Sequence, residues 1–178
     1  MDSGYRSLLA RKHLHALRAD VLGVSLGHDA TLVERIRSLD RRMALLPICT
    51  VVGTLAGAAL ASPLLHTVPP ADAMAVGAGF GYYSLSSIFI SELRSVELGT
   101  VALLCNVLRE LFTLLAAPWV AGRFGPLAAI SSGGATTFDT TLPILTRVAG
   151  PQYAVVAIFH GCVTDFSVPF LVTFFCSI

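Results

Sequence analysis

The feature that most constrains this chain is the near absence of charge after residue 42. The 136 residues of 43–178 contain only four basic and six acidic side chains, whereas residues 1–42 contain eight basic and five acidic ones. A soluble domain carries charge on about a quarter of its residues, but here 13% are charged and 54% are hydrophobic. The same composition excludes a disordered chain, a coiled coil and a nucleic-acid-binding protein. The sequence therefore predicts an all-α polytopic membrane protein, with an N-terminal segment at 1–42 and a membrane domain at 43–178, which the features below identify as a cytoplasmic segment and a transport domain.

Five apolar stretches are candidate membrane spans, because a helix needs about 20 mostly apolar residues to cross a bilayer. They cover about 43–65, 73–91, 98–122, 124–146 and 148–178. Glycine and hydroxyl residues interrupt the second and fourth, so we expect these two to be Gly-rich and broken or re-entrant. In the N-terminal segment, a capping box at Thr31 and Glu34 predicts a short amphipathic surface helix over 30–41.

Arginines beside the spans predict the orientation, because short cytoplasmic loops are enriched in Lys and Arg. Four arginines between 35 and 42 place the N-terminal side in the cytoplasm. With five continuous spans, Arg94 and Arg147 lie inside, whereas Arg123 and the C-terminus lie outside. Arg123 then violates the rule, and a re-entrant fourth segment changes the assignments that follow it.

A faint internal repeat, offset by 54 residues, relates the two interrupted stretches. It pairs Gly79 with Gly133, Ser86 with Thr140, and Asn106 with His160. Gly-interrupted segments in corresponding positions are typical of a transporter site.

Four charged residues lie inside the predicted spans: Arg109, Glu110, Asp139 and Asp165. Each costs roughly 2.5–3.5 kcal/mol at mid-membrane, or about 10–14 kcal/mol together if none is paired. They must therefore pair or line a wet cavity. One interpretation is a polar patch of Asn106, Arg109 and Glu110 that faces a substrate path; the alternative is an ion pair from Arg109 to a neighbouring helix that only holds the bundle together.

The segment 131–141 is the most informative stretch. Its glycines loosen the backbone, its hydroxyls satisfy the freed amides, and Asp139 completes a site for a cation or an ammonium group. The alternative is a Gly/Ser-rich helix that merely packs closely against a neighbour. His160 is interpreted either as a proton-relay group or as a hydrogen-bonded packing residue.

No enzyme activity, cofactor or metal site is predicted. The four cysteines lie in apolar stretches without a Cys-x-x-Cys pair, which is typical of inert buried thiols. Neither Asp139 nor Asp165 follows a Gly-x-Gly sequence, which argues against an intramembrane aspartyl protease.

Six motifs, in order, resemble the bacterial LysO lysine exporter family over about residues 21–178. They are Gly79–Ser87, Glu97–Leu104, Asn106–Glu110, Gly133–Pro143, His160–Gly161 and Val168–Leu171. The resemblance implies export of L-lysine, and of the analogue thialysine, across the inner membrane, with coupling to the proton gradient.

The resemblance also implies which positions form the site. From the chemistry of these side chains we infer that Asp139 and Glu110 hold the ammonium groups of lysine and that Arg109 or the amides of the broken helices meet its carboxylate. Asp165 falls where an uncharged residue is expected. The substrate-binding or proton-coupling positions that match are Asp139, Glu110, Arg109, Asn106, His160, Thr136, Thr140, Thr141, Ser84, Ser86, Gly133 and Gly134.

Members of the family are longer and have more spans than the five predicted here, and the acidic residues of their first half have no counterpart. Four interpretations therefore remain open. The chain is a minimal exporter that acts as a homo-oligomer, the C-terminal membrane subunit of a split exporter that is inactive without a separate N-terminal half, a truncated product, or a passive cation-selective pore. The expected partners are L-lysine and membrane lipid, with no nucleic acid.

Overall fold

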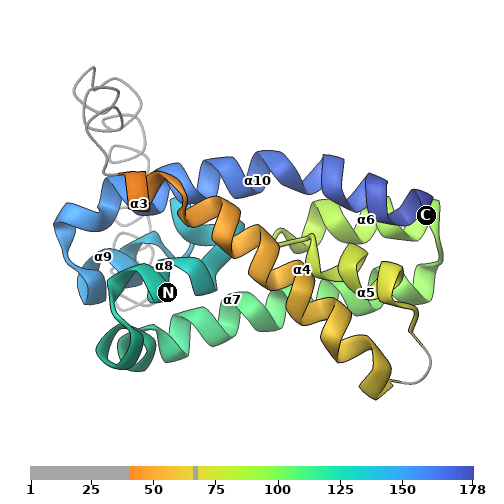
Figure 1. The fold of residues 1–178 in the computed structure, drawn as a ribbon, viewed down its shortest axis with the longest axis horizontal. Helices are drawn as coiled ribbons and strands as arrows, with labels where there is room; N and C mark the ends of the chain where they lie inside the picture. The colour runs from red at the N-terminus through yellow and green to blue at the C-terminus, as the bar shows by residue number, and fades with distance from the viewer. Residues whose placement is uncertain (1–40, 66–67) are drawn as a thin grey trace, which may run out of the picture. The chain divides into compact units, whose positions relative to one another are not determined.

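The computed structural model describes residues 41–65 and 68–178, which form helices joined by short turns (Figure 1). All but the last residue of the surface helix expected at 30–41 lies outside the described residues. The helices are α3 (Arg41–Ala44), α4 (Leu46–Leu65), α5 (Pro70–Gly77), α6 (Tyr83–Leu93), α7 (Val96–Phe124), α8 (Pro126–Gly133), the 3₁₀ helix η1 (Gly134–Phe138), α9 (Leu142–Ala149), the 3₁₀ helix η2 (Pro151–Tyr153) and α10 (Ala154–Ser177).

The all-helical prediction is confirmed for the described residues, but the count of five spans is not. Three helical stretches are long and apolar enough to cross a membrane: Leu46–Leu64, Val96–Phe124 and Pro151–Ser177. The predicted spans at 73–91 and 124–146 instead form α5 with α6, and α8 with η1 and α9. Each of these pieces is too short to cross a bilayer alone.

We call α5, the turn 78–82 and α6 hairpin 1, because the chain reverses direction at the turn (Figure 1). Phe80 has a φ of 45° and Gly81 a φ of 96°, and these left-handed conformations end α5 and redirect the chain. The outer ends of the hairpin meet, since Nε of Arg94, just after α6, lies 3.2 Å from the carboxylate of Asp72 in the first turn of α5. Hairpin 1 therefore begins and ends on the same side of the molecule.

We call α8, η1, the turn 139–141 and α9 hairpin 2. It starts where α7 ends, at Gly125, whose φ of 92° turns the chain back. It finishes at Gly150, just before η2 and α10. Val120, in the second half of α7, packs in one apolar cluster with Ala129 of α8 and Leu145 of α9. Hairpin 2 thus also begins and ends on one side, opposite to the side of hairpin 1 (Figure 1).

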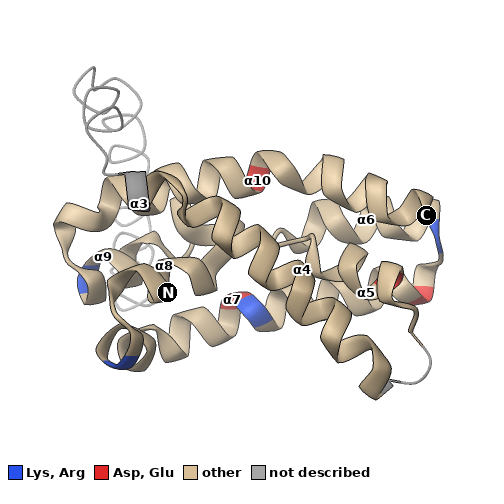
Figure 2. Ribbon diagram, viewed as in Figure 1, with Lys and Arg blue, Asp and Glu red and all other residues tan. Residues whose placement is uncertain are grey.

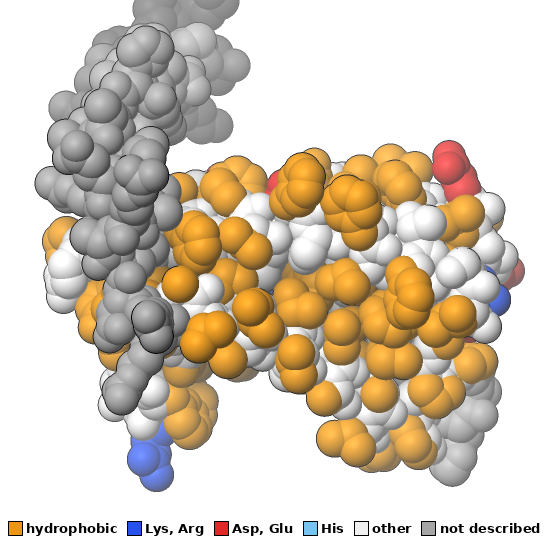
Figure 3. Space-filling model, turned by 45° about the horizontal axis from the view of Figure 1, so that its top comes forward, with side chains coloured by type: hydrophobic (Ala, Val, Ile, Leu, Met, Phe, Trp, Pro, Cys, Tyr) orange, Lys and Arg blue, Asp and Glu red, His pale blue; other side chains and the backbone are white. Residues whose placement is uncertain are grey.

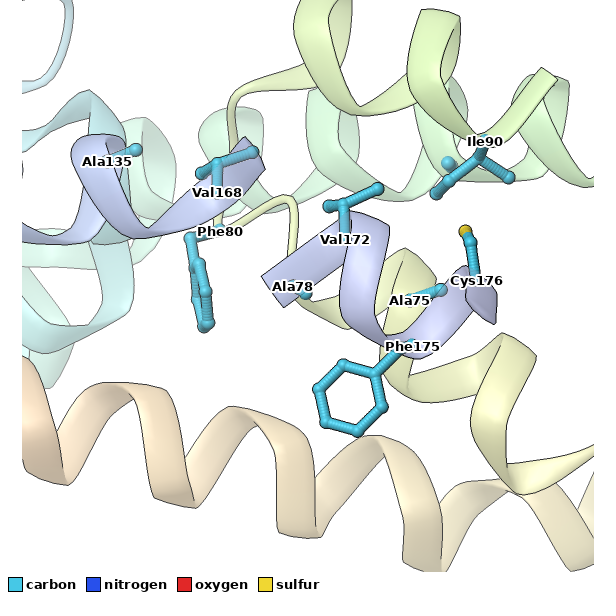
Figure 4. Packing of buried hydrophobic residues seen from close by; sticks show 10 residues of the cluster. Ala75, Ala78, Phe80, Ile90, Ala135, Val168, Val172, Phe175 and Cys176 are labelled. Atoms are coloured by element: carbon cyan, nitrogen blue, oxygen red, sulfur yellow. The ribbon is translucent and has the colours of Figure 1, made fainter. Parts of the chain in front are cut away.

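The long helices α7 and α10 run in opposite directions beside the two hairpins (Figure 1). The first half of α7 and the second half of α10 enclose hairpin 1 in one apolar cluster (Figure 4). The start of α10 packs against hairpin 2 and the start of α4 in a second cluster that includes Leu46, Ile130 and Val156. Each long helix therefore supports one hairpin with one half and the other hairpin with its other half.

The two hairpins meet at their tips. The amide of Ala135, in η1, donates a hydrogen bond of 2.8 Å to the carbonyl of Phe80, in the turn of hairpin 1. Close approach needs residues without side chains: a Cβ on Gly161 of α10 would lie 2.6 Å from the amide nitrogen of Phe138, and one on Gly134 would overlap the carbonyl oxygen of Phe80. Because Gly134 and Gly161 have no side chains, the turn of hairpin 1, η1 and α10 can lie against one another.

The face of the molecule that Figure 3 shows is apolar along most of its length, apart from the part covered by grey atoms. Leu60, Leu64, Leu115, Phe166 and Phe170 are all exposed. Charged residues gather at the two ends of the long helices (Figure 2). The exceptions among the described residues are Arg109, Glu110, Asp139 and Asp165. An apolar belt between polar ends is what a lipid bilayer requires, so this chain is a multi-pass membrane protein.

Candidate functional site

The tips of the two hairpins border a cavity of about 170 Å³. Hairpin 1, hairpin 2, α7 and α10 all contribute to its wall, and the exposed side chains of Tyr82, Tyr83 and Ser84 lie at its edge. The lining residues are Gly81, Tyr82, Tyr83, Ser84, Glu110, Ala135, Thr136, Phe138, Asp139, Thr140 and Asp165.

Three carboxylates face this cavity, and each comes from a different element. Glu110 lies on α7, Asp139 in the turn of hairpin 2, and Asp165 on α10. Asp139 accepts hydrogen bonds from the amide and the hydroxyl of Thr140, the second at 3.1 Å. Among the described residues, no Lys or Arg lines the cavity. The arrangement therefore attracts cations and can hold them through charge-assisted hydrogen bonds.

The same cavity also borders a region of partial positive charge, at the start of α6. Helix α6 begins at Tyr83, and its first turn lines the wall with Tyr83 and Ser84. The free amides at the start of a helix carry partial positive charge and favour a carboxylate. One cavity thus offers carboxylates for ammonium groups and a helix start for an anionic group.

Asn106 of α7 forms hydrogen bonds with backbone groups at the break in hairpin 1. Its Oδ1 accepts a hydrogen bond of 2.7 Å from the amide of Gly81. Its Nδ2 donates to the carbonyl of Val76 at 3.2 Å and to the carbonyl of Ala102 at 2.8 Å. Asn106 is buried, so this side chain replaces the water that a broken helix would need in a membrane.

Arg109, one turn later on α7, donates hydrogen bonds to backbone carbonyls of hairpin 2. Its Nε donates to the carbonyl of Ser132 at 3.0 Å and its Nη2 to the carbonyl of Ser131 at 3.3 Å. These carbonyls are in the last turn of α8, where no further helical amide is available. The guanidinium also lies 5.8 Å from the centre of the Phe80 ring. Within the described residues Arg109 has no acidic partner, so the ion pair that would hold the bundle together is not seen.

His160 of α10 joins three elements. Its Nδ1 lies 3.1 Å from the hydroxyl of Thr137 in η1, and its Nε2 lies 2.9 Å from the hydroxyl of Thr50 in α4. The Thr50 hydroxyl is in turn 2.6 Å from that of Ser131. His160 is fully buried and does not line the cavity. Its geometry is that of a hydrogen-bonded packing residue, and the proton-relay interpretation stays a prediction.

The structure divides the residues expected at the site into two groups. Ser84, Glu110, Thr136, Asp139 and Thr140 line the cavity. The others surround the hairpin tips without lining it: Ser86, Asn106, Arg109, Gly133, Gly134, Thr141 and His160.

Several neighbours of the site were not selected from the sequence. Tyr82, Tyr83 and Phe138 line the cavity, and Thr50 and Thr137 hold His160. A threonine such as Thr50, a single polar residue in an apolar stretch, is a sequence signal that could have indicated a buried hydrogen-bond partner.

Comparison with known proteins agrees with these features. Residues 7–176 match the family described as lysine exporter LysO. This chain belongs to the LysO family. It is 32% identical over 155 residues to lysine exporter LysO of Escherichia coli K12, covering 87% of this chain and 51% of that protein. It is 28% identical over 156 residues to a putative lysine exporter of Haemophilus influenzae, covering 88% of this chain and 78% of that protein.

The chain therefore spans about half the length of its Escherichia coli relative. No solved structure matches it. LysO is a family of exporters, which is not an enzyme class.

Proposed function

We propose that this chain moves L-lysine out of the cell across the bacterial inner membrane, with the cavity at the hairpin tips as the substrate site. One observation carries the proposal: in a chain of the LysO family, three carboxylates and no described basic residue line a cavity between two broken helices. Discontinuous helices that meet near mid-membrane are typical of substrate sites in secondary transporters.

The chemistry of lysine fits the two ends of the cavity. Glu110 and Asp139 together receive an ammonium group of lysine through charge-assisted hydrogen bonds. The carboxylate of lysine lies against the first turn of α6, where Tyr83 and Ser84 provide hydroxyls and the helix start provides partial positive charge. Thialysine differs from lysine only in one side-chain atom between the same charged groups, so it occupies the same site.

Export is coupled to the proton gradient through the same carboxylates. A proton and an ammonium group compete for Glu110 and Asp139, so that each occupies the site when the other has left. Exposure of the site to the two sides of the membrane alternates as the two hairpins that line it move relative to each other.

Both hairpins enter and leave the membrane on one side, as re-entrant segments. The chain then has three spans, and Arg123 and Arg147 lie in the cytoplasm with the start of α4. Arg94 is the exception on the outer side, and it is paired with Asp72. This orientation removes the violation at Arg123 that five continuous spans create. It also makes hairpin 1 with α7 and hairpin 2 with α10 two inverted copies of one unit.

Single cysteines test this topology in a variant whose four natural cysteines are replaced by alanine. We expect Ser95→Cys to react with an impermeant maleimide in intact cells, and Phe124→Cys to react only after the cells are made permeable. Five continuous spans predict the reverse at both positions. Ile178→Cys is the control, because both arrangements place it outside.

Lysine efflux tests the function. Bacteria that lack their own lysine exporters are loaded with labelled lysine and express this chain alone. We expect efflux above the empty-vector control, and a loss of roughly tenfold or more with Asp139→Asn or Glu110→Gln, because each removes a charge-assisted bond to an ammonium group. Glu92→Gln is the matched control, since Glu92 is exposed on α6 and lies outside the cavity.

The same assay separates the remaining interpretations. If the chain is present in the membrane but lysine efflux equals the control, the self-sufficient exporter is rejected and the chain is a subunit that needs a separate N-terminal half. Efflux that persists after a protonophore collapses the proton gradient contradicts coupling and indicates a passive pore. The oligomeric state of the active form follows from the mass of the purified protein.

A further inference from the structure

Asp165 lies on the face of α10 that turns toward the cavity. Its neighbours in sequence occupy the other faces: Thr164 is buried, with its hydroxyl donating to the carbonyl of His160 at 2.6 Å, and Phe166 is 74% exposed on the apolar surface. Asp165 is partly buried and is one of the cavity's three lining carboxylates. The position is therefore set by the packing of α10 against hairpin 2 and not by a flexible loop.

The fold has no evident use for this carboxylate. Asp72, by comparison, holds hairpin 1 closed through Arg94. Asp165 makes no hydrogen bond or ion pair with any described residue. The guanidinium of Arg109 donates hydrogen bonds to carbonyls of α8 instead. An acidic side chain inside a membrane-spanning helix is costly unless a cation or water meets it. The cavity is where such a cation would be bound.

The number of carboxylates fits a ligand with more than one positive group. Three carboxylates from three elements line one cavity, and together they carry more negative charge than a single ammonium group can neutralise. Lysine has two ammonium groups at opposite ends of a flexible chain. With Glu110 and Asp139 holding one of them, Asp165 is left for the other.

We propose that Asp165 is a specificity-determining residue that binds one of the two ammonium groups, so that the cavity selects diamino acids and diamines over compounds with a single ammonium group. This inference rests on the proposed substrate site and adds the substrate class that the site accepts. Truncating or neutralising Asp165 removes the preference for the second ammonium group, whereas Glu110 and Asp139 still hold the first.

Direct binding to the purified full chain tests this inference. The affinity of each of three probes is measured separately by titration calorimetry: L-lysine, cadaverine, which has two ammonium groups and no carboxylate, and L-norleucine, which lacks only the terminal ammonium of lysine. For the natural chain we expect norleucine to bind at least about tenfold more weakly than lysine, as expected for one lost charge-assisted bond.

For Asp165→Asn we expect the affinities for lysine and cadaverine to fall about tenfold or more and that for norleucine to change by less than about twofold. Asp165→Glu keeps the charge and is expected to retain discrimination, which separates a role in selection from a general effect on folding. Glu92→Gln is expected to behave like the natural chain.

The outcomes distinguish the two proposals. If Asp165→Asn binds lysine but keeps the natural ratio of lysine to norleucine affinity, this inference is wrong and lysine export stands. If the natural chain binds cadaverine but not lysine, selection of two ammonium groups stands and lysine as the substrate is wrong. If it binds none of the three probes, both are wrong.

Discussion

Replacing Gly134 by alanine is expected to lower the thermal midpoint of the purified protein by roughly 6–12 °C and to abolish export. Gly134 has a φ of 60° and a ψ of −128°, a conformation that residues with a side chain rarely adopt. An added Cβ would also overlap the carbonyl oxygen of Phe80 and lie 3.2 Å from Nη2 of Arg109. Backbone strain and lost contact together cost about 3 kcal/mol or more, which sets the size of the shift.

Gly57→Ala is the matched control, since a Cβ at Gly57 in α4 meets nothing within 4 Å. We expect its midpoint to stay within about 2 °C of the natural chain, because alanine favours a helix by only about 1 kcal/mol over glycine. Melting is followed by size-exclusion chromatography after heating. Equal midpoints for the two variants would contradict the tip-to-tip contact of the hairpins.

Replacing Arg109 by methionine is expected to destabilise the protein by about 2–3 kcal/mol and to abolish export. The carbonyls of Ser131 and Ser132 lose their donors, and a buried polar group without a partner costs about 1–3 kcal/mol. Removing a charge from the membrane interior returns part of that cost. The cost of the lost hydrogen bonds exceeds the gain from removing the charge, because the carbonyls at the end of α8 have no helical amide to replace the guanidinium.

Arg109 is thus expected to act as a positioning residue for hairpin 2, and the comparison of two readouts tests this. Arg109→Lys keeps the charge with fewer donors and should be intermediate in both stability and export, whereas Arg123→Met, at the exposed end of α7, should keep the natural stability. A variant Arg109→Met with natural stability and no lysine binding would instead make Arg109 a partner of the substrate carboxylate.

The class of protein and the places where helices break could be predicted from local features. Few charges over 136 residues require an apolar environment. Glycine with Ser and Thr at 79–87 and 131–141 indicates where a helix in a membrane is interrupted. Glu110 and Asp139 could be proposed because a charge at mid-membrane is costly enough to need a purpose.

The different contacts made by Asn106, Arg109 and Glu110 of α7 could not be predicted. Helical spacing places Asn106 and Glu110 on one face with Arg109 at its edge. In the structure Asn106 holds hairpin 1, Arg109 holds hairpin 2, and Glu110 lines the cavity. Spacing gives a direction around one helix axis, whereas the partner in that direction depends on which segments pack beside it.

The sequence by itself determined that the chain is an all-helical membrane protein with two interrupted segments and costly polar residues inside. Only the tertiary structure decided that the chain reverses direction within both segments, that they meet at Phe80 and Ala135, and that Asp165 joins Glu110 and Asp139. The physical reason is that hydropathy and helix breaks are local properties of the chain. The reversal of a hairpin and the convergence of carboxylates from three elements depend on contacts between residues distant in sequence, which local patterns do not encode.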